Sequence, residues 1–277
     1  MQIGWHVRQI EHAQLATDHR WLKTQTEMRG FSIEENVNQY LDQWYYMSNS
    51  RNDPVNLYSF VHKNQGDLAF KMFIPKLKDN ILGHLLEWNY DGDMYGKFTD
   101  KERNTVWIAG EQMYCCKTVK INYTTYDIRW DGDTINPRMY PDIMVTSPET
   151  GPNAQPYWYA CVIGIFHTMV SSTHLELEVT ARSWHQMDFL WVWWFGMEHG
   201  RYRHGFQVSH LPKIGFVKSS DNYAFTFLDP AQVIRGAHLI PAFVEGRSSA
   251  LLPAKKSVAC ILNPNNEDDW LNFYINM

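Results

Sequence analysis

The spacing of apolar residues along the chain changes near residue 104. Before that point it is helical: Ser32–Glu35 matches a capping box, and apolar residues from position 33 to 44 recur every three or four positions. Asp79–Leu86, shortly after Pro75, is a second helical stretch. The pattern predicts a mainly helical segment over residues 1–103.

Beyond residue 104 the pattern is typical of strands. Runs rich in β-branched and aromatic residues alternate with turns such as Asp131–Asp133. The expected strands include Thr105–Ala109, Thr118–Ile128, Asp142–Val145, Tyr157–His167, Lys213–Val217 and Ala224–Leu228. The predicted fold class is α+β, with the helical segment followed by a mostly antiparallel β-barrel over residues 104–245. Residues 246–277 are expected to be a flexible segment that ends in a strand-like stub.

The run Met187–Gly196 contains three tryptophans and places large apolar residues on both faces of its predicted strand. Such a strand is either buried on both sides or presents one aromatic face to a partner. Aromatic residues that converge at a barrel rim can enclose a methylated ammonium group or pack against a peptide. The candidate partner-binding residues are Tyr157, Trp158, Trp191, Trp194 and Phe195, and core packing is the competing interpretation.

Composition and charge narrow the function classes. Apolar residues make up 44% of the chain and charged residues 20%, which is typical of a globular protein. The net charge of -5 gives no support to general binding of duplex DNA, which usually requires a basic face. Local nucleic-acid binding stays open as an alternative, with Lys117, Lys120, Arg129 and Arg138 as the residues that would contact phosphate.

Motifs for metal binding and catalysis are weak. The 4 cysteines lack the spacing of a structural zinc site. Asp91–Glu102 places acidic residues at several positions of an EF-hand calcium loop, but Tyr95 stands where a short oxygen ligand is needed. No nucleophile elbow, phosphate-binding loop or dinucleotide motif occurs, so we predict no metal, cofactor or catalytic residue. Without a signal peptide or an apolar run long enough to span a bilayer, we expect a nuclear or cytoplasmic protein without membrane contact.

Several longer motifs, spread over most of the chain, share their order with one family. They are Phe73–Asp79, Asn122–Asp127, Asp133–Arg138, Pro141–Val145, Trp158–Ala160 with Gly164–His167, and Phe227–Gly236 with His238–Phe243. In this order they resemble the C-terminal region of Plavaka-type transposase proteins of basidiomycete fungi. The resemblance implies that the transposase catalytic core lies upstream of this region. It also implies that the chain is a fragment, truncated at both ends, and not itself an enzyme.

The segment from about residue 113 to 243 is also similar in layout to a bromo-adjacent homology (BAH) domain. The similarity rests on Tyr159–Ile165, on the pair Trp194 and Phe195, and on the closing run Val233–Leu239. It implies a BAH-like β-barrel that binds a histone tail or another chromatin protein. The expected function is therefore that of a non-catalytic domain of a transposon-derived protein that contacts chromatin or another protein. The alternatives are an accessory nucleic-acid-binding domain of a transposase and a decayed, non-functional fragment.

The chain departs from the transposase pattern at residues where that pattern has arginine. These residues are His84, Trp107, Trp130, Cys161, Trp193 and Cys260. Changes from arginine to tryptophan, cysteine or histidine are those that C-to-T damage of CpG-containing codons produces, so we hypothesise a decaying copy of a silenced element. On that hypothesis, restoring arginine at Trp193 is expected to be neutral or to improve solubility.

Overall fold

The computed structural model describes residues 44–86, 98–124, 130–149, 155–177, 182–197, 212–248, 250–252, 257–259 and 269–276. Two long antiparallel strands, β8 (Tyr157–Ser172) and β9 (His185–Met197), form its central hairpin. Both strands are rich in aromatic and β-branched residues, which favour extended backbone. Both strands extend beyond the runs expected from the sequence, because β8 continues to Ser172 and β9 already begins at His185.

The other strands pair around this hairpin. They are β1 (Tyr45–Met47), β2 (Pro54–Asn56), β3 (Val106–Ile108), β4 (Gln112–Cys116), β5 (Val119–Thr124), β6 (Trp130–Ile135), β7 (Asp142–Thr146), β10 (Lys213–Phe216), β11 (Phe225–Leu228), β12 (Val233–Gly236), β13 (His238–Pro241), β14 (Arg247–Ser248), β15 (Asp269–Trp270) and β16 (Asn272–Asn276). The large sheet has the order β12-β7-β8-β9-β10-β16-β13, with β3 and β4 beside β8 and β11 beside β9. A small sheet has the order β1-β5-β6. All of these pairings are antiparallel.

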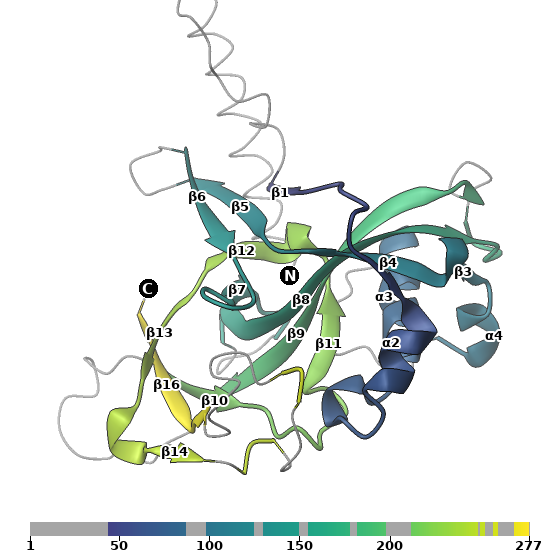
Figure 1. The fold of residues 1–277 in the computed structure, drawn as a ribbon. Helices are drawn as coiled ribbons and strands as arrows, with labels where there is room; N and C mark the ends of the chain where they lie inside the picture. Colours follow the sequence, from purple (N-terminus) through teal and green to yellow (C-terminus); the bar gives the residue numbers. More distant parts are fainter. Residues whose placement is uncertain are drawn as a thin grey trace, which may run out of the picture. The chain divides into compact units, whose positions relative to one another are not determined.

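The prediction of a closed BAH-like barrel is wrong. The end strands of the large sheet, β12 and β13, follow one another in the chain, separated by Ala237. No hydrogen-bonded ladder joins them among the described residues, so the sheet curls without closing (Figure 1). The last strand, β16, lies between β10 and β13 and buries Phe273 and Ile275.

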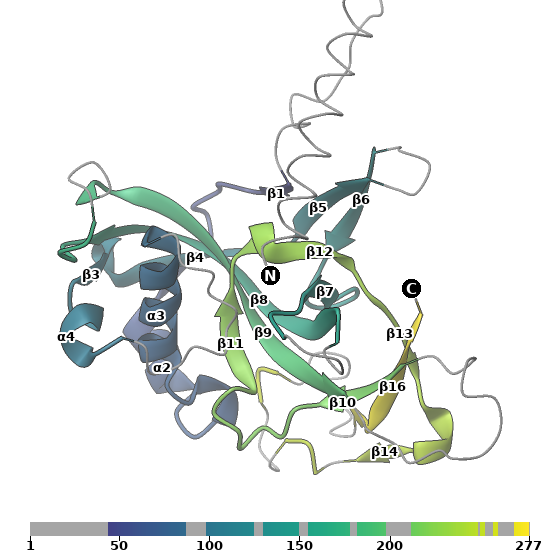
Figure 2. The ribbon, with the colours of Figure 1, turned by 180° about the vertical axis from the view of Figure 1, so that it is seen from behind.

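The prediction of a helical segment that precedes the sheet is also wrong. The described part of residues 1–103 contains the strands β1 and β2 as well as the helices α2 (Leu57–Lys63), α3 (Phe73–Leu85) and α4 (Asp100–Arg103) and the 3-10 turn η1 (Leu68–Phe70). β1 and β2 have three residues each and form because β5 and β4 pair with them, which a local pattern does not reveal. The helices lie against the end of the β8–β9 hairpin that carries β3 and β4 (Figures 1 and 2).

Local sequence explains where the short helices begin. The Asn56 side chain accepts a hydrogen bond from the Ser59 N–H at the start of α2, and Thr99 with Glu102 forms a capping box at α4. Further along the chain, Asp229 caps the 3-10 turn η4 (Pro230–Gln232), which leads into β12. The predicted helix at Ser32–Glu35 lies outside the described residues.

Three buried clusters hold these layers together. The helix-side core lies between the helices and one face of the hairpin, and it includes Leu57, Phe70, Phe73, Leu77, Phe189, Trp191, Trp193 and Phe227. The small-sheet core lies between the opposite face and the small sheet, and it includes Met47, Val119, Ile121, Ile135, Val162, Leu190, Val192 and Trp194. The curl core lies inside the curled part of the large sheet, and it includes Met144, Tyr159, Cys161, Phe195, Ile214, Phe273 and Ile275.

A β-bulge in β8 redirects its side chains. The register with β9 shifts between Val162 and Gly164, which brings Gly164 opposite Trp191. A Cβ atom at Gly164 would lie 2.4 Å from Cε2 of Phe166, so a larger residue does not fit there. The Phe166 ring instead stacks on Phe189, with ring centroids 5.6 Å apart.

The chain divides into two units. One comprises Trp44–Ser147 and Gln155–Met277 and contains the sheets, helices and cores above. The other comprises Met1–Gln43 and Pro148–Ala154, of which only Pro148 and Glu149 are described. Within the described residues, no helix has both the length and the apolar character needed to cross a membrane.

Candidate binding face

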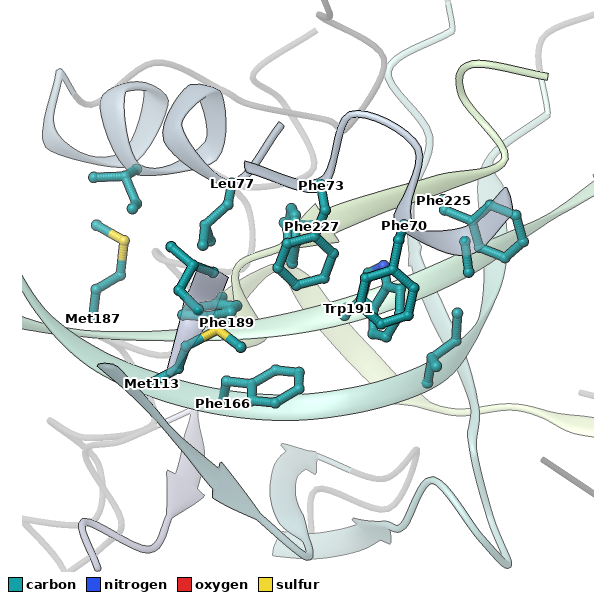
Figure 3. Close-up of a cluster of buried hydrophobic side chains, with 14 of the residues drawn as sticks. Phe70, Phe73, Leu77, Met113, Phe166, Met187, Phe189, Trp191, Phe225 and Phe227 are labelled. Atoms are coloured by element: carbon teal, nitrogen blue, oxygen red, sulfur yellow. The ribbon is translucent and has the colours of Figure 1, made fainter. Parts of the chain in front are cut away.

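The Trp-rich strand is buried on both faces. Trp191 and Trp193 are each 1% exposed, in the helix-side core, while Trp194 lies on the opposite face in the small-sheet core. Trp191 packs edge-on against Phe70 and Phe73, with ring centroids 5.0 and 5.1 Å away (Figure 3). The run Met187–Gly196 therefore has no exposed aromatic face for a partner.

The structure does not bring the five candidate aromatic residues together. Trp158 packs edge-on against Trp194 at 5.7 Å, and the Trp194 indole N–H donates to the Thr226 hydroxyl. Tyr157 and Phe195 belong to the curl core, and Trp191 lies on the other face of β9 from Trp194. An aromatic cage built from Trp158, Trp191 and Trp194 is therefore not geometrically possible.

The candidate phosphate-binding residues lie on the surface. Lys117, Lys120 and Arg138 are exposed, and Arg129 lies outside the described residues. Lys120 is in β5, whereas Arg138 is in the turn after β6. Asp131 of β6, which pairs with Tyr123, is exposed as well, so the exposed charges of the small sheet are of both signs.

Two tryptophans are exposed at the end of the β8–β9 hairpin. Trp107 of β3 is 60% exposed, and Trp184, directly before β9, is 52% exposed. Trp107 pairs with Ser171 of β8, and the Ser171 hydroxyl donates to the carbonyl oxygen of Arg182 at 2.9 Å. Continuing the β8–β9 register by one residue places Trp184 beside Ser171. The two tryptophans therefore flank a serine in one row across three strands, about 10 Å apart at the backbone.

The same face continues along the hairpin. In the next row Met169 pairs with Gln186, and continuing the β4–β8 register by two residues places Gln112 beside Met169; the two glutamines are exposed. The row after it contains Tyr114, His167 and Asp188. We call the surface formed by the first two rows the two-tryptophan face; its residues are Trp107, Ser171, Trp184, Gln112, Met169 and Gln186. Within the described residues, neither indole has a ring contact or a cation–π partner.

The edge of β3 borders this face. In the described part of the chain, β3 pairs only with β8. The Thr173 N–H donates to the Thr105 carbonyl oxygen at 3.0 Å. In an antiparallel ladder, hydrogen-bonded pairs alternate with pairs that are not hydrogen-bonded. Thr105 and Trp107 are therefore in hydrogen-bonded pairs with β8, and Val106 between them is not. The N–H and C=O groups of Val106 therefore point away from β8, toward the open edge.

A cysteine, a histidine and an aspartate lie near one another beyond the two-tryptophan face. His167 and Asp188 are in the third row, and Cys116 is in the row after it, opposite Ile165. Such residues can act as a nucleophile, a base and an acid, but here each one bonds to the chain between Tyr45 and Ser50. The Cys116 thiol donates to the Ser48 carbonyl oxygen at 3.2 Å, the His167 Nε2–H donates to the Ser50 carbonyl oxygen at 3.0 Å, and Asp188 accepts the Tyr45 hydroxyl at 3.2 Å. Burial, together with the charge of Asp188, raises the pKa of Cys116 to about 11. A thiol that stays protonated is a poor nucleophile. The three side chains therefore act as hydrogen-bond partners of the segment Tyr45–Ser50.

Two other buried charged groups are structural. Lys76 donates through Nζ to the Phe225 carbonyl oxygen at 2.8 Å, and burial lowers its pKa to about 8. Asp79 is fully buried and receives two hydrogen bonds from Arg103, at 2.7 and 2.9 Å. Both interactions tie α3 to its neighbours, since β11 and α4 supply the partners.

No group of three or more histidine, cysteine, aspartate or glutamate residues in the described ranges is placed to hold a metal ion. Most of the calcium-loop candidate, residues 91–97, lies outside those ranges. Its last residue, Glu102, accepts hydrogen bonds from the Thr99 N–H and hydroxyl in the α4 capping box.

Comparison of the chain with protein-family models, with curated proteins and with solved structures finds no match in any of the three.

The two-tryptophan face was not predicted from the sequence. Trp107 attracts attention there only as a departure from the transposase pattern, and Trp184 lies within a run that looks polar. Trp184 stands between the polar residues Ser183 and His185, and single exposed apolar residues are common on protein surfaces, so the local sequence carries no signal that marks this face.

Proposed function

We propose that the chain is a binding domain that uses the two-tryptophan face to hold an extended segment of another protein. The observation that carries the proposal is the placement of Trp107 and Trp184 in one row, both more than half exposed. Single exposed apolar residues are common on protein surfaces, but tryptophans dominate the energetics of many interfaces. This role keeps the non-catalytic, protein-binding function expected from the sequence, and it assigns binding to residues outside the buried strand.

The open edge of β3 favours a polypeptide as the occupant. Val106 directs one backbone donor and one backbone acceptor toward that edge, directly beside Trp107. An extended segment can hydrogen-bond to such an edge while its alternate side chains reach the neighbouring face. Single-stranded nucleic acid could stack on the indoles, but the net charge of -5 opposes the phosphate backbone.

Peptide display against the whole chain tests the proposal. A random peptide library would be selected on the wild-type protein, with counter-selection on the double variant W107A/W184A. We expect enriched peptides whose affinity falls at least about tenfold for each single alanine variant, because each tryptophan acts as a hot spot. Circular dichroism would verify that both variants remain folded.

Phe243→Ala provides the matched control, since Phe243 is also exposed but lies beyond β13, away from this face. The Phe243→Ala variant should bind the selected peptides with the same affinity as the wild type. The proposal is overturned if the enriched peptides bind W107A and W184A as tightly as the wild type, or if only single-stranded DNA binds in a tryptophan-dependent manner.

A further inference from the structure

The segment Ser48–Asp53, here called the strap, crosses the hairpin beside the two-tryptophan face. It connects β1 to β2, and all of its six residues are exposed and polar or charged. Met47 before it is buried in the small-sheet core, and β2 after it pairs with β4. The strap is therefore fixed at both ends but contributes no apolar side chain to a core.

Polar contacts alone hold the strap over the sheet. Its carbonyl groups at Ser48 and Ser50 accept hydrogen bonds from Cys116 and His167. The Asn49 side chain accepts a hydrogen bond from the Gln186 amide at 2.7 Å. At its last residue, the Asp53 carbonyl oxygen accepts a hydrogen bond from the Cys115 N–H, and two residues earlier the Arg51 guanidinium lies 5.7 Å from the centre of the Tyr114 ring.

These contacts show how the sheet face binds an extended backbone. The strap occupies the row of Tyr114, His167 and Asp188, and its bond to Gln186 brings it within one row of Trp107 and Trp184. A segment that pairs with the β3 edge at Val106 and then continues across the face toward β9 would meet the strap at Gln186. The side chains that now bind the strap carbonyls could bind the carbonyls of such a segment in the same way.

We propose that the strap occupies part of the binding face in the free protein, and that a partner segment displaces the strap when the partner extends past the two tryptophans. The inference rests on the proposed function, because it assigns regulation to the same face. In this scheme the strap competes with the partner, so weakening the strap strengthens partner binding. In the open state the strap has left the face. Breaking one of the strap's hydrogen bonds should raise the population of the open state about fivefold. The apparent affinity for the partner segment rises by the same factor while the open state is rare.

The experiment compares Asn49→Ala with Asn52→Ala in the full chain. Asn49→Ala removes the acceptor for Gln186, whereas the Asn52 side chain has no bond within the described residues. The first measurement is the rate at which iodoacetamide alkylates Cys116, in a Cys115→Ala background so that the adjacent thiol does not contribute. The second is the affinity for a peptide selected on the two-tryptophan face.

We expect Asn49→Ala to accelerate alkylation of Cys116 and to tighten peptide binding, each about fivefold, while Asn52→Ala changes neither. The strap inference fails if the peptide still requires Trp107 and Trp184 but Asn49→Ala leaves its affinity unchanged or weakens it. It also fails if Asn49→Ala and Asn52→Ala accelerate alkylation equally, because the strap is then not held by the Asn49 bond. Failure of the proposed function is distinct, since it shows as peptide binding that does not depend on the two tryptophans.

Discussion

Replacing Trp193 with arginine is a change for which the structure and the hypothesis of a decaying element predict opposite results. The hypothesis places an ancestral arginine at this residue and expects the replacement to be harmless. The structure places Trp193 in the helix-side core, where it is 1% exposed. Its ring stacks on Phe216 with centroids 4.0 Å apart and lies 5.1 Å from Phe225, and its indole N–H donates to the Val217 carbonyl oxygen at 2.8 Å.

The expected cost follows from these contacts. Removing a buried tryptophan side chain typically costs about 3–5 kcal/mol, and a buried charge without a partner adds several more. A guanidinium in the same slot could stack on the two phenylalanines and donate to Val217, which recovers about 2 kcal/mol. We therefore expect Trp193→Arg to lower the free energy of unfolding by at least about 4 kcal/mol. That is a large part of the about 5–15 kcal/mol that stabilises a typical protein.

Urea unfolding followed by circular dichroism, together with the soluble fraction after expression, measures this loss. Trp107→Arg is the matched control, because Trp107 is also an arginine in the transposase pattern but is exposed, so its stability should stay within about 0.5 kcal/mol of wild type. Trp193→Phe keeps a stacked ring and leaves the Val217 carbonyl without its donor, for an expected loss of about 1–3 kcal/mol. Equal stability of Trp193→Arg and wild type would refute the reasoning and show that the slot accepts a guanidinium.

Three further predictions concern stability. Gly164→Ala should cost about 1–3 kcal/mol in urea unfolding, because its Cβ would lie 2.4 Å from a ring atom of Phe166; an unchanged midpoint would mean that the bulge adjusts freely. Arg103→Ala should cost about 3–5 kcal/mol in the same assay, because it leaves the buried carboxylate of Asp79 unpaired, and a loss below 1 kcal/mol would contradict this. Burial raises the pKa of Asp142 from 3.8 to about 7, so the folded chain keeps a proton that the unfolded chain releases between these values. Stability should therefore fall as pH rises through that window, and Asp142→Asn should show a smaller difference between urea midpoints at pH 5 and pH 8 than wild type.

Much of the secondary structure could be predicted from the sequence. The expected strands at Asp142–Val145, Tyr157–His167 and Ala224–Leu228 are confirmed as β7, β8 and β11, within a few residues at their ends. β-branched and aromatic residues favour extended backbone locally, so their runs reveal strands without knowledge of the fold. The strands β1 and β2 were missed because three residues carry too little local signal, and only their pairing with β5 and β4 makes them strands.

The candidate site was less predictable than the fold. The sequence favours the aromatic residues of Met187–Gly196 because they are concentrated there, but concentration does not distinguish a core from an interface. Trp107 and Trp184 are 77 positions apart in the sequence and become neighbours only through the registers of β3, β8 and β9. A surface formed by residues so far apart has no local pattern that could predict it.

The residues of Met187–Gly196 specify a strand with large apolar side chains on both faces, because side chains alternate along any extended backbone. The elements that cover those faces are known only from the folded chain: helices and the curled sheet lie on one face, and the small sheet lies on the other. Burial depends on which distant elements pack against a strand, whereas extension depends on neighbouring residues. For that reason the strand richest in tryptophan is core, whereas Trp184 directly before it and Trp107 of β3 are at the surface.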